Sequence, residues 1–264
     1  MYKVLDKACK GLDKVVEDFA NCTTERQEKE QVEMMRPVIY PNYAYSNDNY
    51  INPILENKLI RHAFRAIAIK YYSKQLEEII QNDIKLTSTN FPKLWTNCQY
   101  CYSLLGISNP PEVYITSKLC GINALSAEMK GKQIVMLSFQ STIMLNDLEQ
   151  RFVIGHELGH IQLGHLSAHT IQGLLQDLNK RAELLGPIVN DMVDVPLNRW
   201  YRTSEFSADR AGYLCCMDIE TINKLFNRLK TNIPTNSYNQ YKELSDAHPC
   251  LNKRLEVLQK FINS

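Results

Sequence analysis

A chain of 264 residues is long enough to bury a sizeable core, as one large domain or as one domain with an appendage. Its composition, 44% hydrophobic and 22% charged, is that of an ordinary globular protein. With 30 lysines and arginines against 29 aspartates and glutamates the formal net charge is +1, so no polyanion-binding surface is indicated and we expect no nucleic acid partner.

The N-terminus, MYKVLDKACKGLDKVVEDFA, mixes charged with apolar residues and has no uninterrupted apolar run, so we do not expect a secretory signal. No stretch reaches the roughly eighteen consecutive apolar residues that a membrane-spanning helix needs. The eight cysteines are irregularly spaced and are expected to be reduced thiols. For Cys98 and Cys101 we favour buried thiols one helical turn apart over a redox pair. These features predict a cytoplasmic protein without an integral membrane segment.

Residues 1–85 are expected to form an N-terminal helical region. One or two charged amphipathic helices should occupy the first fifty residues and end in the turn-rich PNYAYSNDNYINP. Apolar residues then recur at intervals of three and four between Leu55 and Asn82, which predicts a long helix.

The remaining residues, 86–264, are predicted to form an α+β domain that is dominated by helices and has a small sheet in the middle. Helices are expected over 91–105, over 171–190, over 204–216, over 218–230, over 251–262, and from the cap at Asn146 through the motif described next. Strands are expected at Glu112–Thr116 and Lys132–Ser138.

The stretch VIGHELGHIQLGH, residues 153–165, contains an H-E-x-x-H motif. His156 and His160 are four residues apart, so on a helix both imidazoles lie on one face and can reach one ion. Leaving these polar groups buried and unpaired would cost several kcal/mol, which favours a metal site. Glu157 adjoins the first histidine and is placed to take a proton from a water molecule activated by the ion.

A catalytic zinc site needs a third protein ligand. His165 does not fit the extended motif with a third histidine, which would require glycine at position 163 and histidine at position 166; the chain has Leu163 and Leu166 there. Along a continued helix His165 would also point away from His156. We therefore interpret His165 and His169 as surface or structural histidines.

A glutamate from a second helix is the other source of a third ligand. Of the glutamates after His160, only Glu205 has an acid four residues later, Asp209. We predict that Glu205 completes the metal site and that Asp209 accepts a hydrogen bond from a ligand histidine and so fixes its orientation.

The joint pattern of IGHELGHIQLGH and SEFSADRAG resembles the HtpX-like and CaaX-type family of gluzincin metallopeptidases. The resemblance extends from about Glu112 to Leu258. It implies a zincin-like metalloprotease domain with an active-site helix and one Zn²⁺ per chain. His156, His160 and Glu205 would be the metal ligands and Glu157 the general base.

Two flanking segments extend this resemblance. Asn123 and Ala124 are similar to the family's Asn-Ala segment, which implies an edge strand beside which a substrate peptide adds. His248-Pro249 followed by Arg254 is similar to the family's His-Pro…Arg element. His248 could stabilise the oxyanion, could occupy the open metal position, or could simply begin a helix, and these alternatives stay open.

Many members of that family carry membrane-spanning helices between the two motifs. Here the interval carries several charges, so the chain resembles the soluble branch. Peripheral membrane contact through Leu184 to Trp200 has no basic cluster to support it. The leading prediction is a zinc-dependent metalloendopeptidase that acts on proteins or peptides. The alternative is a catalytically silent or latent zincin-like protein with a binding or regulatory role.

Overall fold

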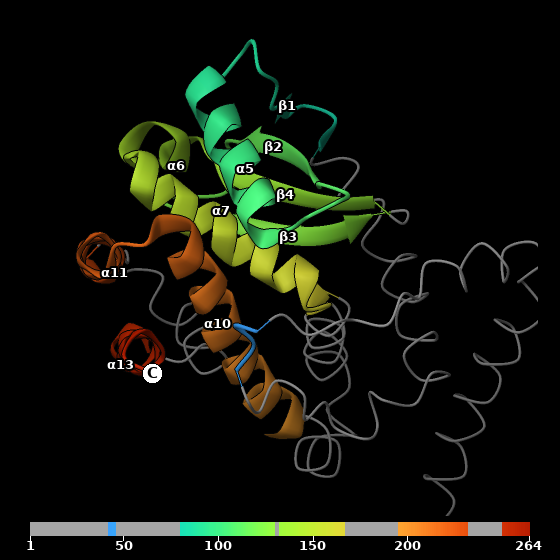
Figure 1. Ribbon diagram of the computed structural model, residues 1–264. Helices are drawn as coiled ribbons and strands as arrows, with labels where there is room; N and C mark the ends of the chain where they lie inside the picture. The colour runs from blue at the N-terminus through green and yellow to red at the C-terminus, as the bar shows by residue number, and fades with distance from the viewer. Residues whose placement is uncertain (1–41, 46–79, 130–131, 167–194, 232–249) are drawn as a thin grey trace, which may run out of the picture.

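The computed structural model of the chain describes residues 42–45, 80–129, 132–166, 195–231 and 250–264. Within these residues six helices and a four-stranded sheet form a mixed α/β fold in which helices predominate (Figure 1). The helices are α5 (Pro92–Leu105), α6 (Phe139–Met144), α7 (Asp147–Gln162), α10 (Val195–Cys216), α11 (Ile219–Thr231) and α13 (Leu251–Ile262). The strands are β1 (Ile84–Lys85), β2 (Glu112–Thr116), β3 (Ala124–Met129) and β4 (Lys132–Ser138).

The sheet has the strand order β1-β2-β4-β3. The two predicted strands, β2 and β4, pair in parallel at its centre, while β1 and β3 add antiparallel on either side. Ile134 to Leu137 of β4 are all buried, as expected for a central strand covered on both faces. In this order β3 forms the edge of the sheet opposite β1, and it lies next to α7.

Helix α7 begins where the sequence predicts. The Asn146 side chain accepts a hydrogen bond from the Glu149 amide, and a Glu149 carboxylate oxygen accepts one from the Asn146 amide, both at 3.0 Å. Arg228 of α11 contacts the other Glu149 carboxylate oxygen at 2.7 Å. The cap thus fixes the start of the helix that carries H-E-x-x-H and ties it to α11.

The other described helices also follow the predictions, except that α6 was not predicted and α10 differs in length. Helix α5 ends at Gly106, whose φ of 67° is left-handed, and α13 has the predicted bounds. Helix α10 begins at Val195, whereas the sequence predicts a start near Ser204. Pro196 lies in its first turn, where proline is tolerated because the amide there has no helical acceptor. The predicted helix at 171–190 and most of the one at 55–82 lie outside the described residues.

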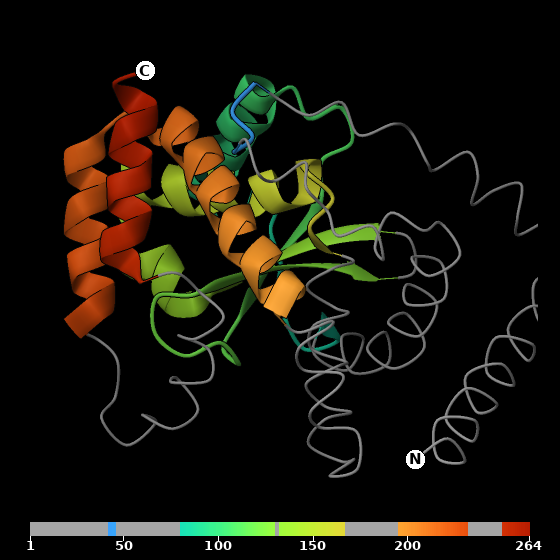
Figure 2. The ribbon, with the colours of Figure 1, turned by 90° about the horizontal axis from the view of Figure 1, so that it is seen from below.

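Glycines and alanines line the contact between α7 and α10, so the backbones of the two helices approach each other closely. A methyl group on Gly159 would lie 2.8 Å from the Ala211 Cβ and 3.0 Å from the Ala208 Cα. One on Gly212 would lie 2.7 Å from the Phe152 carbonyl oxygen. Helices α11 and α13 then pack beside α10 around a second apolar cluster (Figure 2).

A short described segment before the sheet also packs on this helical layer. The Tyr43 hydroxyl donates to Gln162 Oε1 of α7 at 2.7 Å, and Arg210 of α10 donates to the carbonyls of Tyr43 and Ala44 at 3.2 and 3.1 Å. Tyr43 is buried in the main core. A domain boundary between residues 85 and 86 stays a prediction, because most of residues 1–79 lie outside the described part.

The described cysteines are free thiols. Cys98 and Cys101 are fully buried in the core between α5, α7 and α10, and burial raises the pKa of Cys98 to about 12. A redox pair needs an accessible thiolate, so the expectation of buried thiols is confirmed. Among the described helices, none has the length and apolarity to cross a bilayer.

The close contact of α7 with α10 leads to a stability prediction for Gly159→Ala. On an open helix surface this change would stabilise by up to ~1 kcal/mol, because alanine is the better helix former. Here the methyl group meets the backbone of α10, so we expect a net loss of about 1–3 kcal/mol in the free energy of unfolding. Chemical denaturation of the metal-free protein measures it. The control is Asn223→Ala, on the exposed face of α11, which should change the free energy of unfolding by less than ~0.5 kcal/mol. A Gly159→Ala protein as stable as wild type, or more stable, would contradict the packing argument.

Candidate metal centre

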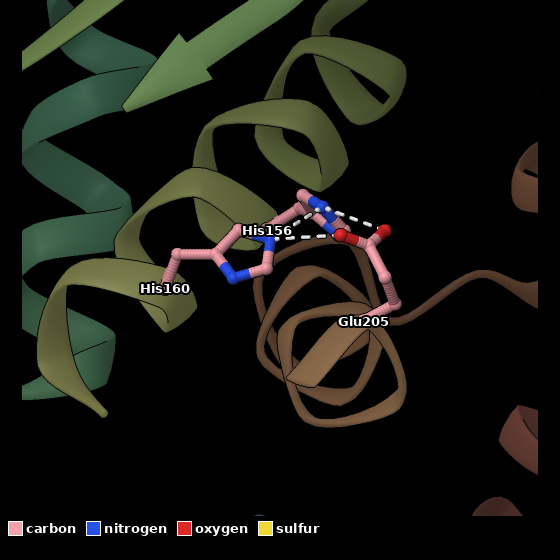
Figure 3. A group of neighbouring side chains, drawn as sticks. All are labelled: His156, His160 and Glu205. Carbon is pink, nitrogen blue, oxygen red and sulfur yellow. Dashed lines mark hydrogen bonds and ion pairs between the residues drawn. The ribbon is translucent and has the colours of Figure 1, made fainter. Parts of the chain in front are cut away.

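Three side chains from α7 and α10 converge on one point (Figure 3). The Nε2 atoms of His156 and His160 are 3.1 Å apart. Glu205 places one carboxylate oxygen 3.4 Å from the His160 Nε2 and the other 3.7 Å from the His156 Nε2. One donor atom from each of the three residues lies within 4.8 Å of the other two. The convergence predicted from the two i, i+4 motifs is therefore present.

These distances fit a small divalent ion. Ligand bonds of about 2.0–2.1 Å in a tetrahedral site place the donor atoms about 3.3 Å from one another. The two Nε2 atoms are 3.1 Å apart, His160 Nε2 is 3.4 Å from Glu205 Oε1, and His156 Nε2 is 3.7 Å from Glu205 Oε2, so these separations lie near that value. Two imidazole nitrogens and a carboxylate oxygen also form a donor set that zinc accepts. His156, His160 and Glu205 could hold a metal ion, and their assignment as ligands stays a prediction.

Asp209 lies one turn beyond Glu205 and takes the position predicted for it. Its Oδ1 is 3.1 Å from the His156 Nδ1, on the side of the ring opposite the metal-facing nitrogen. If Nδ1 carries the proton, the ring donates to Asp209 and keeps a lone pair on Nε2 for a metal ion. The carboxylate thus selects the tautomer that the site requires.

Arg254 of α13 is a member of the site that local sequence patterns do not identify. Its guanidinium makes a two-pronged contact with Asp209 at 2.6 and 2.7 Å and reaches a Glu205 carboxylate oxygen at 2.8 Å. Burial alone would raise the pKa of Asp209, but the charge and hydrogen bonds of Arg254, together with the contact to His156, hold it below the ordinary value. Arg254 therefore keeps Asp209 ionised and also places its charge against Glu205.

The two histidines differ in their electrostatic surroundings. Burial lowers the pKa of His160 below its ordinary value and outweighs the opposing contact with Glu205. Burial acts on His156 in the same direction, but the hydrogen bond to Asp209 and the charge of Glu205 outweigh it and raise the pKa. His160 is thus held neutral by its surroundings, as metal ligation requires, while a proton competes more strongly for His156.

His165 lies elsewhere than the sequence suggests. The prediction that His165 points away from His156 assumed a continuous helix, but α7 ends at Gln162. The side chain is 1% exposed, and its Nδ1 lies 2.9 Å from the His160 Nδ1. The surface alternative is therefore wrong for His165, while His169 lies outside the described residues. Gly164, a common helix terminator, was the available signal that the helix stops here.

The remaining candidate residues are placed only in part. Glu157 lies on α7 between the two histidines and is 7% exposed. Ala124 begins β3, an edge strand of the sheet, and Asn123 directly precedes it. His248 lies outside the described residues, so its alternative roles stay open.

The buried Arg254 cluster gives a prediction about pH. In the metal-free protein the pKa of Asp209 lies below 3.8, so its stabilising contribution is complete above that value and is lost as pH falls through it. Arg254→Met removes the cation and leaves burial to raise the pKa of Asp209. The folded variant then holds protons that the unfolded chain releases, and its stability falls as pH rises.

We expect the difference in the free energy of unfolding between wild type and Arg254→Met to widen between about pH 4 and about pH 6, toward ~3–5 kcal/mol. Denaturant titrations of the metal-free proteins measure it. Lys253→Met, also on α13, removes an exposed partner of the exposed Glu256 and should show a small, nearly constant difference. Parallel pH curves for wild type and Arg254→Met would show that Arg254 does not hold these charges.

Comparison with known proteins places this site within a known group. The sequence pattern of peptidase family M48 matches residues 88–262. The chloroplastic plastoglobule-localized metallopeptidase 48 of Arabidopsis thaliana is 25% identical over 126 residues, which are 47% of this chain and 36% of that protein. The chain thus spans about a third of that relative, and no solved structure matches it. Because the family match covers more than half of the chain and includes both α7 and α10, the chain belongs to peptidase family M48.

Proposed function

We propose that the protein is a zinc-dependent metalloendopeptidase. The observation that carries the proposal is the convergence of His156, His160 and Glu205, with one donor atom each within 4.8 Å of the others. Membership of a peptidase family supports hydrolysis of peptide bonds. The relative's printed name describes a metallopeptidase, which points the same way, although the chain covers only 36% of that protein.

In the proposed reaction each site residue has a separate task. When bound, Zn²⁺ polarises the scissile carbonyl and lowers the pKa of a water molecule toward ~7. Glu157 removes the proton from the attacking water and delivers it to the leaving amine. Its near-complete burial keeps bulk water from competing for that proton. Asp209 and Arg254 hold His156 and Glu205 in place during these steps.

The outer strand β3 is the proposed place for the substrate backbone. The Asn123 amide donates to Ser141 Oγ and its carbonyl accepts from the Ser138 amide, both at 2.9 Å, so these two groups face inward. In an antiparallel pair the direction alternates along the strand, so the main-chain groups of Ala124 and Ser126 face the outer edge. A peptide lying beside β3 would bond to these residues rather than to Asn123.

A latent or silent zincin-like protein is the second candidate. A silent protein, which has lost catalysis, would need the metal-binding residues but would have no use for a general base at position 157. The presence of a buried glutamate between the two histidines favours the enzyme. The cytoplasmic location expected from the sequence stays a prediction, and the chloroplast location belongs to the relative's name alone.

Glu157→Gln tests the catalytic role directly. The amide keeps the size of the side chain but cannot take a proton, so we expect an unchanged metal content and a fall in kcat of about 10²–10⁴-fold. Peptide-library or casein cleavage, together with metal analysis, measures both quantities. Glu220→Gln, the same change on α11, should behave as wild type; cleavage at the wild-type rate by Glu157→Gln would overturn the mechanism.

Because main-chain groups of β3 face the outer edge only at every second residue, we expect only every second backbone amide of the substrate to matter for cleavage. For a fluorogenic peptide selected from a library, methylation of one backbone nitrogen at a time should reduce kcat/KM about tenfold at alternate residues, because each lost hydrogen bond is worth about 1–1.5 kcal/mol. Methylation of the residues between them should have little effect, since those amides face away from β3. Uniform sensitivity along the peptide, or none, would argue against binding as an added strand.

A further inference from the structure

The end of α7 has the hydrogen bonding of a Schellman motif. The His165 amide donates to the His160 carbonyl at 2.9 Å, and the Gly164 amide donates to the Ile161 carbonyl at 3.2 Å. Gly164 has a φ of 72°, a left-handed conformation that glycine adopts without strain. The chain therefore turns back at Gly164 and lays residue 165 against the last turn of the helix.

This reversal brings a second imidazole against His160. The Nδ1 atoms of His160 and His165 are 2.9 Å apart, and the two rings meet at 67° with their centroids 5.2 Å apart. Both side chains are buried. At this separation one Nδ1 carries a proton and donates a hydrogen bond to the other, which is unprotonated. Two protonated or two unprotonated nitrogens would repel each other.

The opposite side of the His160 ring decides which nitrogen is the donor. The His160 Nε2 faces Glu205 Oε1 at 3.4 Å and the His156 Nε2 at 3.1 Å, so it needs a free lone pair if the ring is a metal ligand. The proton of the neutral ring then lies on Nδ1, which donates to the His165 Nδ1. His165 is correspondingly neutral with its own proton on Nε2.

We propose that His165 is a positioning residue for the metal site: its Nδ1 accepts a hydrogen bond from the His160 Nδ1–H and thereby fixes the tautomer and the orientation of that ligand. This rests on the proposed function, since it takes His160 as a ligand. The two histidine ligands then have different partners. His156 donates to the charged Asp209, which is itself held by Arg254, whereas His160 donates to a neutral imidazole.

A pair of substitutions separates positioning from simple packing. His165→Leu fills similar space but cannot accept a proton, and His165→Asn can present Oδ1 near the place of Nδ1. We expect the leucine variant to raise the Kd for Zn²⁺ about 10–100-fold, measured by competition with a chelator, and the asparagine variant to stay within about threefold of wild type. The visible spectrum of the Co²⁺-substituted protein should shift with leucine and not with asparagine. Wild-type zinc affinity in His165→Leu, or equal losses in the two variants, would overturn the proposal.

A measurement on the wild-type chain covers the case in which a variant fails to fold. In the zinc-loaded protein labelled with ¹⁵N-histidine, we expect a scalar coupling across the N–H···N hydrogen bond that links the Nδ1 atoms of His160 and His165. An unprotonated His160 Nδ1, or the absence of this coupling, would contradict the proposal.

The failure of the proposed function would look different. If His160→Ala binds zinc as tightly as wild type, His160 is not a ligand and the metal assignment itself is wrong. If His160→Ala loses zinc while His165→Leu keeps wild-type affinity, the site stands and only the role of His165 is refuted.

Discussion

The close contact between α7 and α10 determines whether this chain can have a metal centre. Each helix carries two adjacent stripes, one of small residues and one of site residues. Gly155 and Gly159 on α7 set the distance to α10, and His156 and His160, one position further along, reach across that distance to Glu205. A larger side chain in the small stripe would separate the helices, and the three donor atoms would no longer share an ion. Packing and chemistry thus depend on the same spacing.

The charges of the site explain why a third helix takes part. Glu205 and Asp209 are both buried, and each ionised carboxylate without a partner would cost several kcal/mol. Arg254 contacts both, so Asp209 stays ionised and both carboxylates are held in position before any metal ion binds. This preorganisation lowers the cost of ordering the ligands on binding. The C-terminal helix α13 is therefore part of the metal centre although it offers no metal ligand.

The features that could be predicted from the sequence are those that depend on the periodicity of a single helix. Residues four apart share a helix face in any structure, so His156 with His160 and Glu205 with Asp209 could be paired without knowledge of the fold. The contact of His165 was missed because α7 was assumed to continue through Gly164. Arg254 was named only through a family resemblance, since a contact between residues about fifty positions apart leaves no local signal. Strand β3, with the sequence ALSAEM, lacks β-branched residues and owes its form to pairing with β4.

The central claim is that one divalent ion is shared by α7 and α10, and diffraction at the zinc absorption edge tests it most directly. Crystals of the zinc-loaded protein should show one anomalous peak per chain, about 2.0–2.2 Å from the Nε2 atoms of His156 and His160 and from a Glu205 carboxylate oxygen. A peak bound to other residues, or a Glu205 carboxylate turned away from the ion, would contradict the account.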